Sequence, residues 1–304
     1  MQRVRKQLGC TDEVLNRYDG GKGITIAMLD TGIAVHPDFD HKLLLFKDFV
    51  NHQKTVYDDC GHGTHVAGCM SGNGKCSGGD LKGIAPETNL VVGKVLDKNG
   101  DGQIGNMVAG LEWVLENKDF YQIKILNISI GTGKQLRIGK ISPLLSLVTE
   151  ACRQGIIVVC AAGNNGPGEM TLSPIGSLRD VITVGCHEGG YFGEREDLCE
   201  HYSGCGPSIY DIRKPDIVAP GTQIFSCNAF FSKRGKHLKN AYIAKSGTSM
   251  STPIVSGAVA LLLKKNPQMK AEEVKRKLQL TSLDLKEPWY KQGCGLIQIN
   301  SLLT

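Results

Sequence analysis

The chain has 304 residues, of which 41% are hydrophobic and 21% are charged, and its formal net charge is +5. This length can bury a full core without disulfides or a metal, as one large α/β domain or as two smaller ones. Its basic residues are scattered or follow a helical spacing without interleaved aromatic residues, as in residues 264–277. We therefore expect a solvated helix face there and no nucleic-acid binding.

The composition also bears on the cellular compartment. The first ten residues, MQRVRKQLGC, are basic but lack the apolar region and cleavage site of a secretory signal. No window has the uninterrupted apolar length that crosses a bilayer, so we expect no membrane association. The eleven cysteines are odd in number and scattered, and several, such as Cys160, lie in apolar segments. These features predict reduced thiols and a cytoplasmic protein.

Apolar strands alternate with helices along most of the chain. Residues 1–20 are polar and predict an N-terminal arm, and residues 24–29 form a wholly apolar strand that ends in Asp30. Strands of this kind belong to parallel sheets covered on both faces. Further strands are predicted at residues 89–95, 123–130, 156–161 and 181–184, and helices at 107–117, 144–154, 250–265 and 271–280. The alternation predicts a single α/β domain, residues 21–304, with helices on both faces of a mainly parallel sheet.

The segment SGTSMSTP, residues 246–253, leads directly into an apolar helix. Ser249 therefore falls in the first helical turn, and Pro253 stands where a missing amide costs little. The free N–H groups and positive dipole end of such a turn can stabilise an oxyanion formed when a serine attacks a carbonyl. Taken alone, Ser249 is explained more simply as a helix cap.

Two other segments place titratable side chains beside small residues. Asp30 ends an apolar strand, where open α/β sheets hold their ligands, although aspartate is also a common turn former. His62 opens a helix-like stretch within DDCGHGTHVAGCMSG. His62 and His65 could form a zinc pair, but no HExxH glutamate lies between them. The cysteine and histidine cluster at residues 199–205 lacks a second ligand pair and predicts a loop.

Asp30, His62 and Ser249 occur in this order, within the segments DTG, GHGTHVAG and GTSMSTP. These segments resemble the three signature segments of the subtilisin-like serine proteases, peptidase family S8. The resemblance extends through KVLDKNGDGQI, NISIG, AAGNNG, KPDIVAPG and LIQINSLL, so it covers the chain from about Gly20 onward. The chain is most similar in character to intracellular bacterial members without a prodomain. The resemblance implies the subtilisin-like three-layer α/β sandwich.

The resemblance also implies a serine endopeptidase that acts through an acyl-enzyme intermediate. Ser249 would be the nucleophile, His62 the general base and then the general acid, and Asp30 the group that orients the imidazole. Asn164 matches the family's oxyanion-hole asparagine, whose amide would share the developing charge with the Ser249 N–H. His65 is expected to pack or to hydrogen-bond instead of taking part in the reaction.

The implied substrate is an extended peptide or an unfolded protein, held by main-chain pairing. By resemblance, two chain edges would flank it: Gly100, Asp101 and Gly102 on one side, and Ser129, Ile130 and Gly131 on the other. One wall of the pocket for the residue before the scissile bond would consist of Ala161, Ala162 and Gly163. These small walls favour a large apolar side chain in that pocket.

No cofactor is expected to be required. Asp38 matches a calcium ligand of secreted relatives, but the glycine-rich segment 71–83 is unlike their calcium loop. The DKNGDG segment begins like an EF-hand but has Val108 where the bidentate glutamate belongs. The alternatives are a catalytically silent subtilisin-like peptide-binding scaffold, a zinc hydrolase, and a nucleotide-binding protein, although the last lacks GxGxxG and GxxxxGK[ST]. A further hypothesis places Leu8 of the arm in the cleft as an inhibitor.

Overall fold

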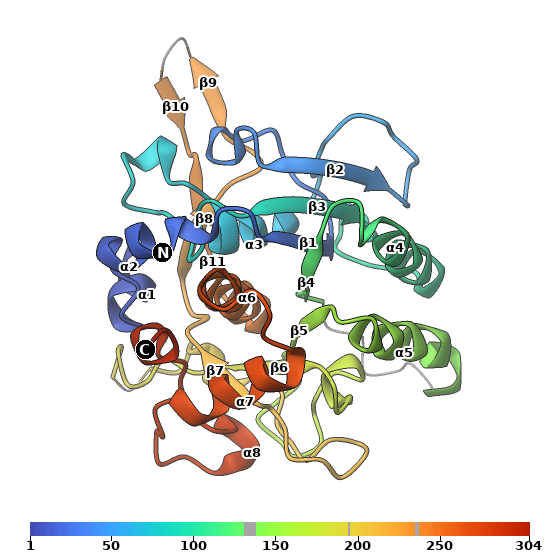
Figure 1. The fold of residues 1–304 in the computed structure, drawn as a ribbon, viewed down its shortest axis with the longest axis vertical. Helices are drawn as coiled ribbons and strands as arrows, with labels where there is room; N and C mark the ends of the chain where they lie inside the picture. Colours follow the sequence, from blue (N-terminus) through green and yellow to red (C-terminus); the bar gives the residue numbers. More distant parts are fainter. Residues whose placement is uncertain (131–137, 194, 235–236) are drawn as a thin grey trace.

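The computed structural model describes residues 1–130, 138–193, 195–234 and 237–304. Its centre is a seven-stranded sheet with the order β2-β3-β1-β4-β5-β6-β7, in which every pairing is parallel (Figure 1). The strands are β1 (Thr25–Asp30), β2 (Leu43–Asp48), β3 (Asn89–Lys94), β4 (Ile123–Ile128), β5 (Ile157–Ala161), β6 (Ile182–Cys186) and β7 (Ile217–Ala219). The predicted α/β sandwich with a mainly parallel sheet is confirmed.

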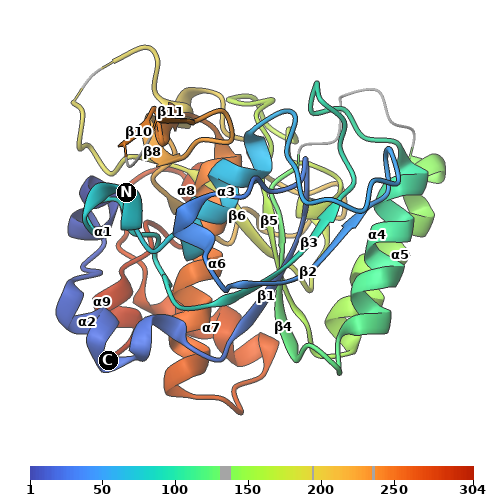
Figure 2. The same cartoon turned by 90° about the horizontal axis from the view of Figure 1, so that it is seen from above.

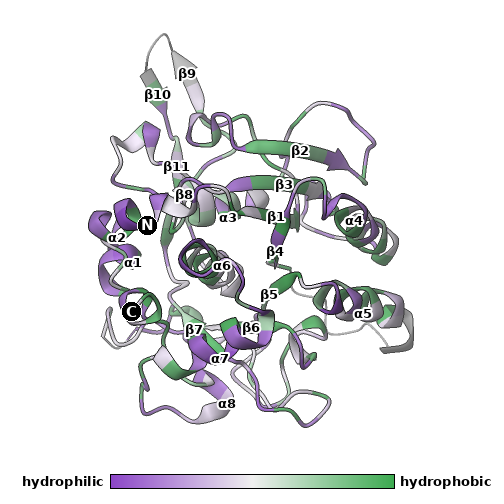
Figure 3. Ribbon diagram, viewed as in Figure 1, coloured by the Kyte–Doolittle hydropathy of each residue, from purple (hydrophilic) through white to green (hydrophobic). Residues whose placement is uncertain are grey.

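Helices cover both faces of this sheet (Figures 1 and 2). One face carries α4 (Ile104–Asn117) and α5 (Ile138–Arg153), and the other carries α3 (His62–Ser71) and α6 (Thr248–Lys265). The chain then continues through α7 (Ala271–Thr281), α8 (Trp289–Gln292) and α9 (Ile299–Leu302). Figure 3 shows hydrophobic residues along the central strands and hydrophilic ones on the outer helices α1, α2 and α7.

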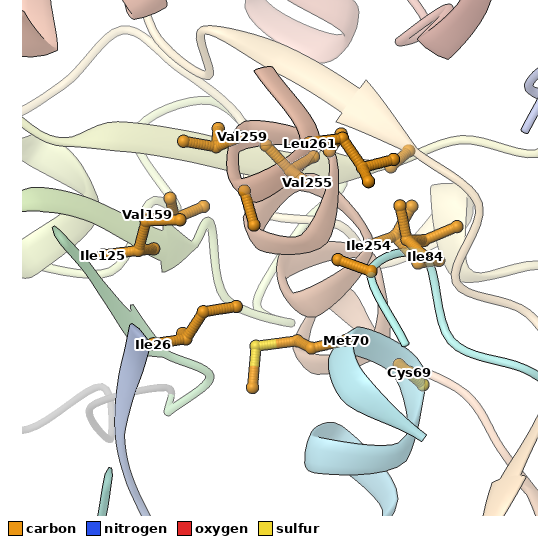
Figure 4. Packing of buried hydrophobic residues seen from close by; sticks show 14 of the residues in the cluster. Ile26, Cys69, Met70, Ile84, Ile125, Val159, Ile254, Val255, Val259 and Leu261 are labelled. Carbon is orange, nitrogen blue, oxygen red and sulfur yellow. The ribbon is translucent and has the colours of Figure 1, made fainter. Parts of the chain in front are cut away.

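Successive side chains of a β-strand point to opposite faces of the sheet, so each central strand contributes to a hydrophobic cluster on both faces. In β1, Ile26 and Met28 belong to the hydrophobic cluster that includes α3 and α6, whereas Ala27 and Leu29 belong to the cluster that includes α4 and α5. Figure 4 shows part of the first cluster, gathered from the sheet, α3 and α6. Helix α6 is buried continuously from Thr248 to Leu263, because it runs between the sheet and the surrounding elements. This rigid, central helix carries Ser249 at its beginning.

The N-terminal arm forms two short helices, α1 (Gln2–Gln7) and α2 (Asp12–Arg17). Leu8 is fully buried in the core, and its carbonyl accepts a hydrogen bond from the Ile299 N–H at 2.8 Å. The Tyr18 hydroxyl donates to the Leu303 carbonyl at 3.0 Å. The arm is thus packed against the C-terminal helix α9. The hypothesis that Leu8 fills the substrate cleft is wrong, because its side chain is already buried in this core.

Short antiparallel strands were not predicted from the sequence. They are β8 (Ile224–Cys227), which pairs with β11 (Tyr242–Lys245), and β9 (Ser232–Arg234), which pairs with β10 (His237–Lys239). The β9–β10 hairpin projects from the body of the molecule in Figure 1. The second strand of the other pair, β11, leads almost directly into α6.

Candidate active site

Asp30 and His62 form a hydrogen-bonded pair at the carboxyl edge of the sheet. Asp30 ends β1 and is fully buried, and His62 is the first residue of α3. The His62 Nδ1–H donates to Asp30 Oδ1 at 2.7 Å, and the same oxygen accepts the Thr31 N–H at 2.7 Å. With its proton on Nδ1, the imidazole keeps the Nε2 lone pair available to accept a proton. The His62 side chain is 24% exposed, so the ring is reachable from solvent.

The electrostatic environment of His62 favours its protonated form. Burial disfavours charge on the ring, but the Coulombic attraction and the hydrogen bond of Asp30 outweigh it, so the pKa of His62 is raised above 6.5. A base that gains a proton during a reaction is stabilised in this way at the moment the proton arrives. The pair is therefore suited to act as a general base.

Asp58 ties the end of β1 to the start of α3. Its carboxylate accepts hydrogen bonds from the Thr31 hydroxyl (2.8 Å), the Gly61 N–H (2.7 Å), and both the N–H (2.8 Å) and hydroxyl (2.6 Å) of Thr64. The Thr31 hydroxyl in turn accepts the Gly63 N–H at 2.9 Å. Burial raises the pKa of Asp58, but these donors outweigh it and hold that pKa below 3.8. The network fixes Asp30 relative to His62.

Sequence reasoning missed Asp58 and Thr31, although both lie inside the quoted motifs. The available signal was an acidic residue shortly before a helix start, which is a typical capping position.

Lys94, in the neighbouring strand β3, also connects the end of β1 to the segment before α3. It is fully buried, lies opposite Asp30 in the β1–β3 register, and donates to the Thr31 carbonyl at 2.8 Å and to Asp59 at 2.6 Å.

Ser249 lies in the first turn of α6, as predicted, and is 9% exposed. The residue that precedes this turn, Gly247, has φ 140° and ψ 164°, a conformation that is essentially restricted to glycine. The Ser251 hydroxyl donates to the Ala219 carbonyl at 2.9 Å, which anchors the turn to the carboxyl end of β7. None of the hydrogen bonds among the described residues joins Ser249 to His62. Such contacts often tighten only when substrate binds.

Asn164 lies beside the same turn. It follows β5 and is exposed, and its Oδ1 accepts hydrogen bonds from both the N–H and the hydroxyl of Thr248, each at 3.1 Å. A Cβ added to Gly247 would lie 3.4 Å from Asn164 Nδ2. Because Oδ1 is held by Thr248, the Nδ2 group is left to donate. This arrangement places an amide donor next to the first turn of α6.

His65 is separated from this chemistry. It is fully buried, and its Nε2–H lies 2.8 Å from the Ile224 carbonyl. Burial lowers the pKa of His65 to about 3, so the ring stays neutral at ordinary pH. His62 Nδ1 points to Asp30 while His65 Nε2 points to the main chain of β8. The two histidines therefore engage different partners and do not converge as a zinc pair.

The predicted substrate edges lie in two loops. Gly102 pairs with Leu96 in an isolated antiparallel bridge, and the Asp101 carbonyl accepts the Asp97 N–H at 2.9 Å, which closes the turn that contains Gly100. Both Asp101 and Gly102 are exposed.

On the other side, Ser129 directly follows β4 and is 1% exposed, and Ile130 is half-buried. Gly131 lies outside the described residues. The three small residues predicted to form a pocket wall, Ala161, Ala162 and Gly163, end β5 and follow it. Ala161 and Ala162 are only 1% and 0% exposed, so neither presents an accessible side chain.

Asp38 does not have the surroundings of a calcium ligand. Its Oδ1 accepts the Cys76 N–H at 3.0 Å, and its Oδ2 accepts the Gly74 N–H at 3.1 Å and the Tyr242 hydroxyl at 2.9 Å. The Cys227 thiol also faces Oδ2 at 3.6 Å. Calcium takes six to eight oxygen ligands, whereas hydrogen-bond donors and sulfur surround this carboxylate. The residues present therefore do not fit that ion.

No helix in the described ranges is long and apolar enough to span a membrane.

A family model described as "Subtilase family" matches residues 21–296. Serine protease AprX of Bacillus subtilis (strain 168) is 40% identical over 270 residues, which are 85% of this chain and 61% of AprX. The chain thus spans less than two thirds of that relative's length. Subtilisin DY of Bacillus licheniformis is 31% identical over 293 residues, which are 95% of this chain and 94% of subtilisin DY.

Two solved structures also match the fold of this chain. Sphericase superposes with a TM-score of 0.77 at 27% identity, over 94% of this chain and 96% of its own. A cold adapted subtilisin-like serine proteinase superposes with a TM-score of 0.72 at 27% identity, over 91% and 89% of the two chains. By its matched domain, its similarity along nearly the whole sequence and its fold, the chain belongs to the subtilase family of serine proteases.

Proposed function

We propose that this chain is a serine endopeptidase that hydrolyses peptide bonds through Asp30, His62 and Ser249. The observation that carries the proposal is the 2.7 Å contact between His62 Nδ1 and buried Asp30, at the same edge of the sheet as the first turn of α6, which contains Ser249. A binding scaffold has no need of a buried carboxylate that fixes the tautomer of a reachable imidazole. This argument favours an enzyme over the silent-scaffold alternative.

The proposed reaction uses each of these groups in turn. His62 Nε2 removes the hydroxyl proton of Ser249 as its oxygen attacks the peptide carbonyl, and Asp30 stabilises the imidazolium that forms. The carbonyl oxygen becomes an oxyanion, which the Asn164 amide and the N–H groups of the first turn of α6 stabilise. His62 then protonates the leaving amine. In the second half of the reaction, water attacks the acyl-enzyme with His62 again as the base.

The substrate in this proposal is an extended peptide or unfolded protein segment. The main chain of exposed Gly102 would pair with this segment by β-strand addition, whereas the N–H and carbonyl of Asp101 already bond to Asp97. Pairing through the backbone depends little on side chains, which is consistent with protein turnover or with the processing of a peptide precursor. No additional cofactor is needed for these steps.

We place the enzyme in the cytoplasm. All eleven cysteines lie in the described part of the chain as free thiols, and seven of them are buried. Unpaired thiols in this number are typical of a reducing compartment. Trapping of thiols in intact cells followed by mass spectrometry should find all of them reduced. Recovery of the protein from the medium, or with disulfides, would contradict this placement.

Hydrolysis of an unfolded protein and of a short chromogenic peptide tests the activity itself. Ser249→Ala should abolish turnover, by roughly 10⁶-fold in kcat, a size taken from measurements on subtilisin. Ser246→Ala is a matched control in the same segment, because Ser246 is exposed and its hydroxyl contacts only the Gln223 N–H among the described residues. Equal activity in Ser249→Ala and the control would refute the proposal. Peptide binding without turnover by the unmodified protein would favour the scaffold.

A further inference from the structure

Three side chains that catalysis does not use meet in the interior, between two loops and β8. Asp38 lies in the 3₁₀ turn Pro37–Phe39, and His36 directly precedes this turn. Cys227 is the last residue of β8. His36, Asp38 and Cys227 are 2%, 0% and 1% exposed. One potential ligand atom of each lies within 4.8 Å of the others. His36 Nδ1 is 3.7 Å from Asp38 Oδ1, and Cys227 Sγ is 3.6 Å from Asp38 Oδ2.

The orientation of His36 matches that of a metal ligand. Its Nε2 lies 2.9 Å from the Ala241 carbonyl, which can only accept, so the proton resides on Nε2. Nδ1 is then unprotonated and faces Asp38, where it accepts the Asp38 N–H at 3.1 Å. Metal-binding histidines typically donate their other ring N–H to a backbone carbonyl in this way, which fixes both the tautomer and the ring.

A fourth donor lies next to these three. Cys76, in the 3₁₀ turn Lys75–Ser77, donates its main-chain N–H to Asp38 Oδ1 at 3.0 Å, so its side chain starts beside this carboxylate, although its Sγ is not one of the three ligand atoms that lie within 4.8 Å of one another. With metal–sulfur and metal–nitrogen bonds of about 2.3 and 2.0 Å, the ligand atoms of a tetrahedral site are roughly 3.3–3.8 Å apart. The two separations given above for Asp38 fall within this range, but the one to His36 ends on Oδ1 and the one to Cys227 ends on Oδ2. Binding of an ion therefore requires one carboxylate oxygen to turn toward both ligands and the Cys76 thiol to join them.

The chemical nature of the ligand atoms indicates which metal ion this site would bind. Two thiols, one imidazole and one carboxylate are a poor set for calcium or magnesium, which require oxygen ligands, and a good one for zinc. We infer that His36, Asp38, Cys227 and Cys76 form a structural binding site for one Zn²⁺ ion per chain. On binding, Cys76 and Cys227 each release their thiol proton to solvent and coordinate as thiolates. With the carboxylate, the loaded site carries a net charge of −1.

Such an ion would join three segments that are far apart in the sequence. It would link the turn at Pro37–Phe39 and the turn at Lys75–Ser77 to β8, whose partner β11 leads into α6. The site closes its coordination sphere with protein ligands, as structural zinc sites do, and the inference does not depend on the proposed proteolysis.

Cobalt titration tests the site, because Co²⁺ reports its ligands in its absorption spectrum. The full chain carrying Ser249→Ala, which prevents self-cleavage, is stripped with a chelator and titrated with Co²⁺. We expect a thiolate-to-cobalt charge-transfer band and tetrahedral d–d bands that saturate at about one equivalent and disappear when Zn²⁺ is added. Zn²⁺ should also raise the Tm, whereas Ca²⁺ should not. A folded protein without the sulfur band would overturn the inference.

Variants then locate the ion. Cys227→Ser and His36→Gln should each lower the bound cobalt at least tenfold, and Cys76→Ser, which alters a half-exposed residue, is the variant least expected to disturb folding. Cys60→Ser is the matched control, because Cys60 is half-exposed and lies two positions before His62 in the sequence. Loss of the band in Cys60→Ser, with retention in Cys76→Ser and Cys227→Ser, would place the ion at the active site and refute the assignment.

Discussion

Replacing Asp30 with asparagine removes the charge behind His62 while leaving most of the geometry in place. Asp30 Oδ1 accepts both the Thr31 N–H and the His62 Nδ1–H, and Oδ2 is buried without a hydrogen-bond partner in the described structure. An asparagine can keep its oxygen at the Oδ1 position and so retain both contacts. The substitution therefore isolates the electrostatic contribution of the carboxylate from its role in orientation.

The size of the effect follows from Coulomb's law. For charge centres about 4 Å apart and an effective dielectric constant of about 20, the attraction between carboxylate and imidazolium is about 4 kcal/mol. The imidazolium forms only as the reaction proceeds, so kcat should fall by about 10³-fold in Asp30→Asn. KM should change little, because Asp30 lies behind His62 and does not contact the substrate peptide in this mechanism.

The pH dependence gives a second readout. His62 must be neutral to act as a base, and its pKa is raised above 6.5, so kcat/KM should decline as pH falls through a midpoint above 6.5. In Asp30→Asn the attraction of the carboxylate is lost while burial and the charge of Lys245 still lower the pKa of His62, so the midpoint should move below that of the unmodified enzyme. The ion pair also stabilises the fold most fully below about pH 6.5, the unfolded value, and this contribution disappears as pH rises through the raised pKa.

Steady-state kinetics on a chromogenic peptide, together with NMR titration of the imidazole, measures these quantities. Asp119→Asn, which changes a carboxylate that is 92% exposed, controls for the loss of one negative charge. The reasoning is refuted if Asp30→Asn retains kcat within tenfold of the unmodified enzyme, or if the midpoint does not move.

Three further substitutions test the neighbouring parts of the site. Asn164→Ala should lower kcat by roughly 10²- to 10³-fold with little change in KM, a size taken from measurements on subtilisin, and an unchanged kcat would exclude it as an oxyanion donor. Asp58→Asn should lower the free energy of unfolding by about 2–4 kcal/mol, because asparagine replaces one of the two oxygens that accept hydrogen bonds with an NH₂ group. Denaturant titration at neutral pH measures this change. Gly247→Ala should cost about 1–3 kcal/mol, because alanine rarely adopts this backbone conformation, and should lower kcat as the first turn of α6 shifts to relieve the strain. Gly105→Ala, which has no atom within 4 Å of the added Cβ, should be neutral or stabilising in α4. Equal stabilities of the two glycine variants would contradict the backbone argument.

The parts of the fold that local patterns encode were predicted correctly. The wholly apolar segment of β1 and the long apolar run of α6 indicated a buried parallel sheet and a buried helix, and both lie where the sequence placed them. Strand β2 was missed because Leu43–Asp48 has no regular alternation of apolar and polar residues and ends in two charged ones. Strands β8 to β11 were missed because each is only three or four residues long, and because β9 and β10 are mostly polar.

Contacts between distant segments could not be predicted from the sequence. Asp38 and Cys227 are separated by 189 positions, and no local periodicity indicates that they meet. The packing of the N-terminal arm could not be predicted either, because Leu8 is buried beside α9, a helix at the opposite end of the sequence. The order of Asp30, His62 and Ser249 indicated a reaction, whereas the support given by Asp58 and Lys94 emerged only from three-dimensional contacts.

Labelling with a serine-directed fluorophosphonate tests the central claim most directly, because the probe reacts only with a serine activated by a working base. Intact mass and peptide mapping should show a single adduct on Ser249, no adduct in Ser249→Ala, and a labelling rate that falls at least 10²-fold in His62→Ala. Absence of any adduct on folded protein, or an adduct on another serine, would contradict the account of Asp30, His62 and Ser249 as one catalytic unit.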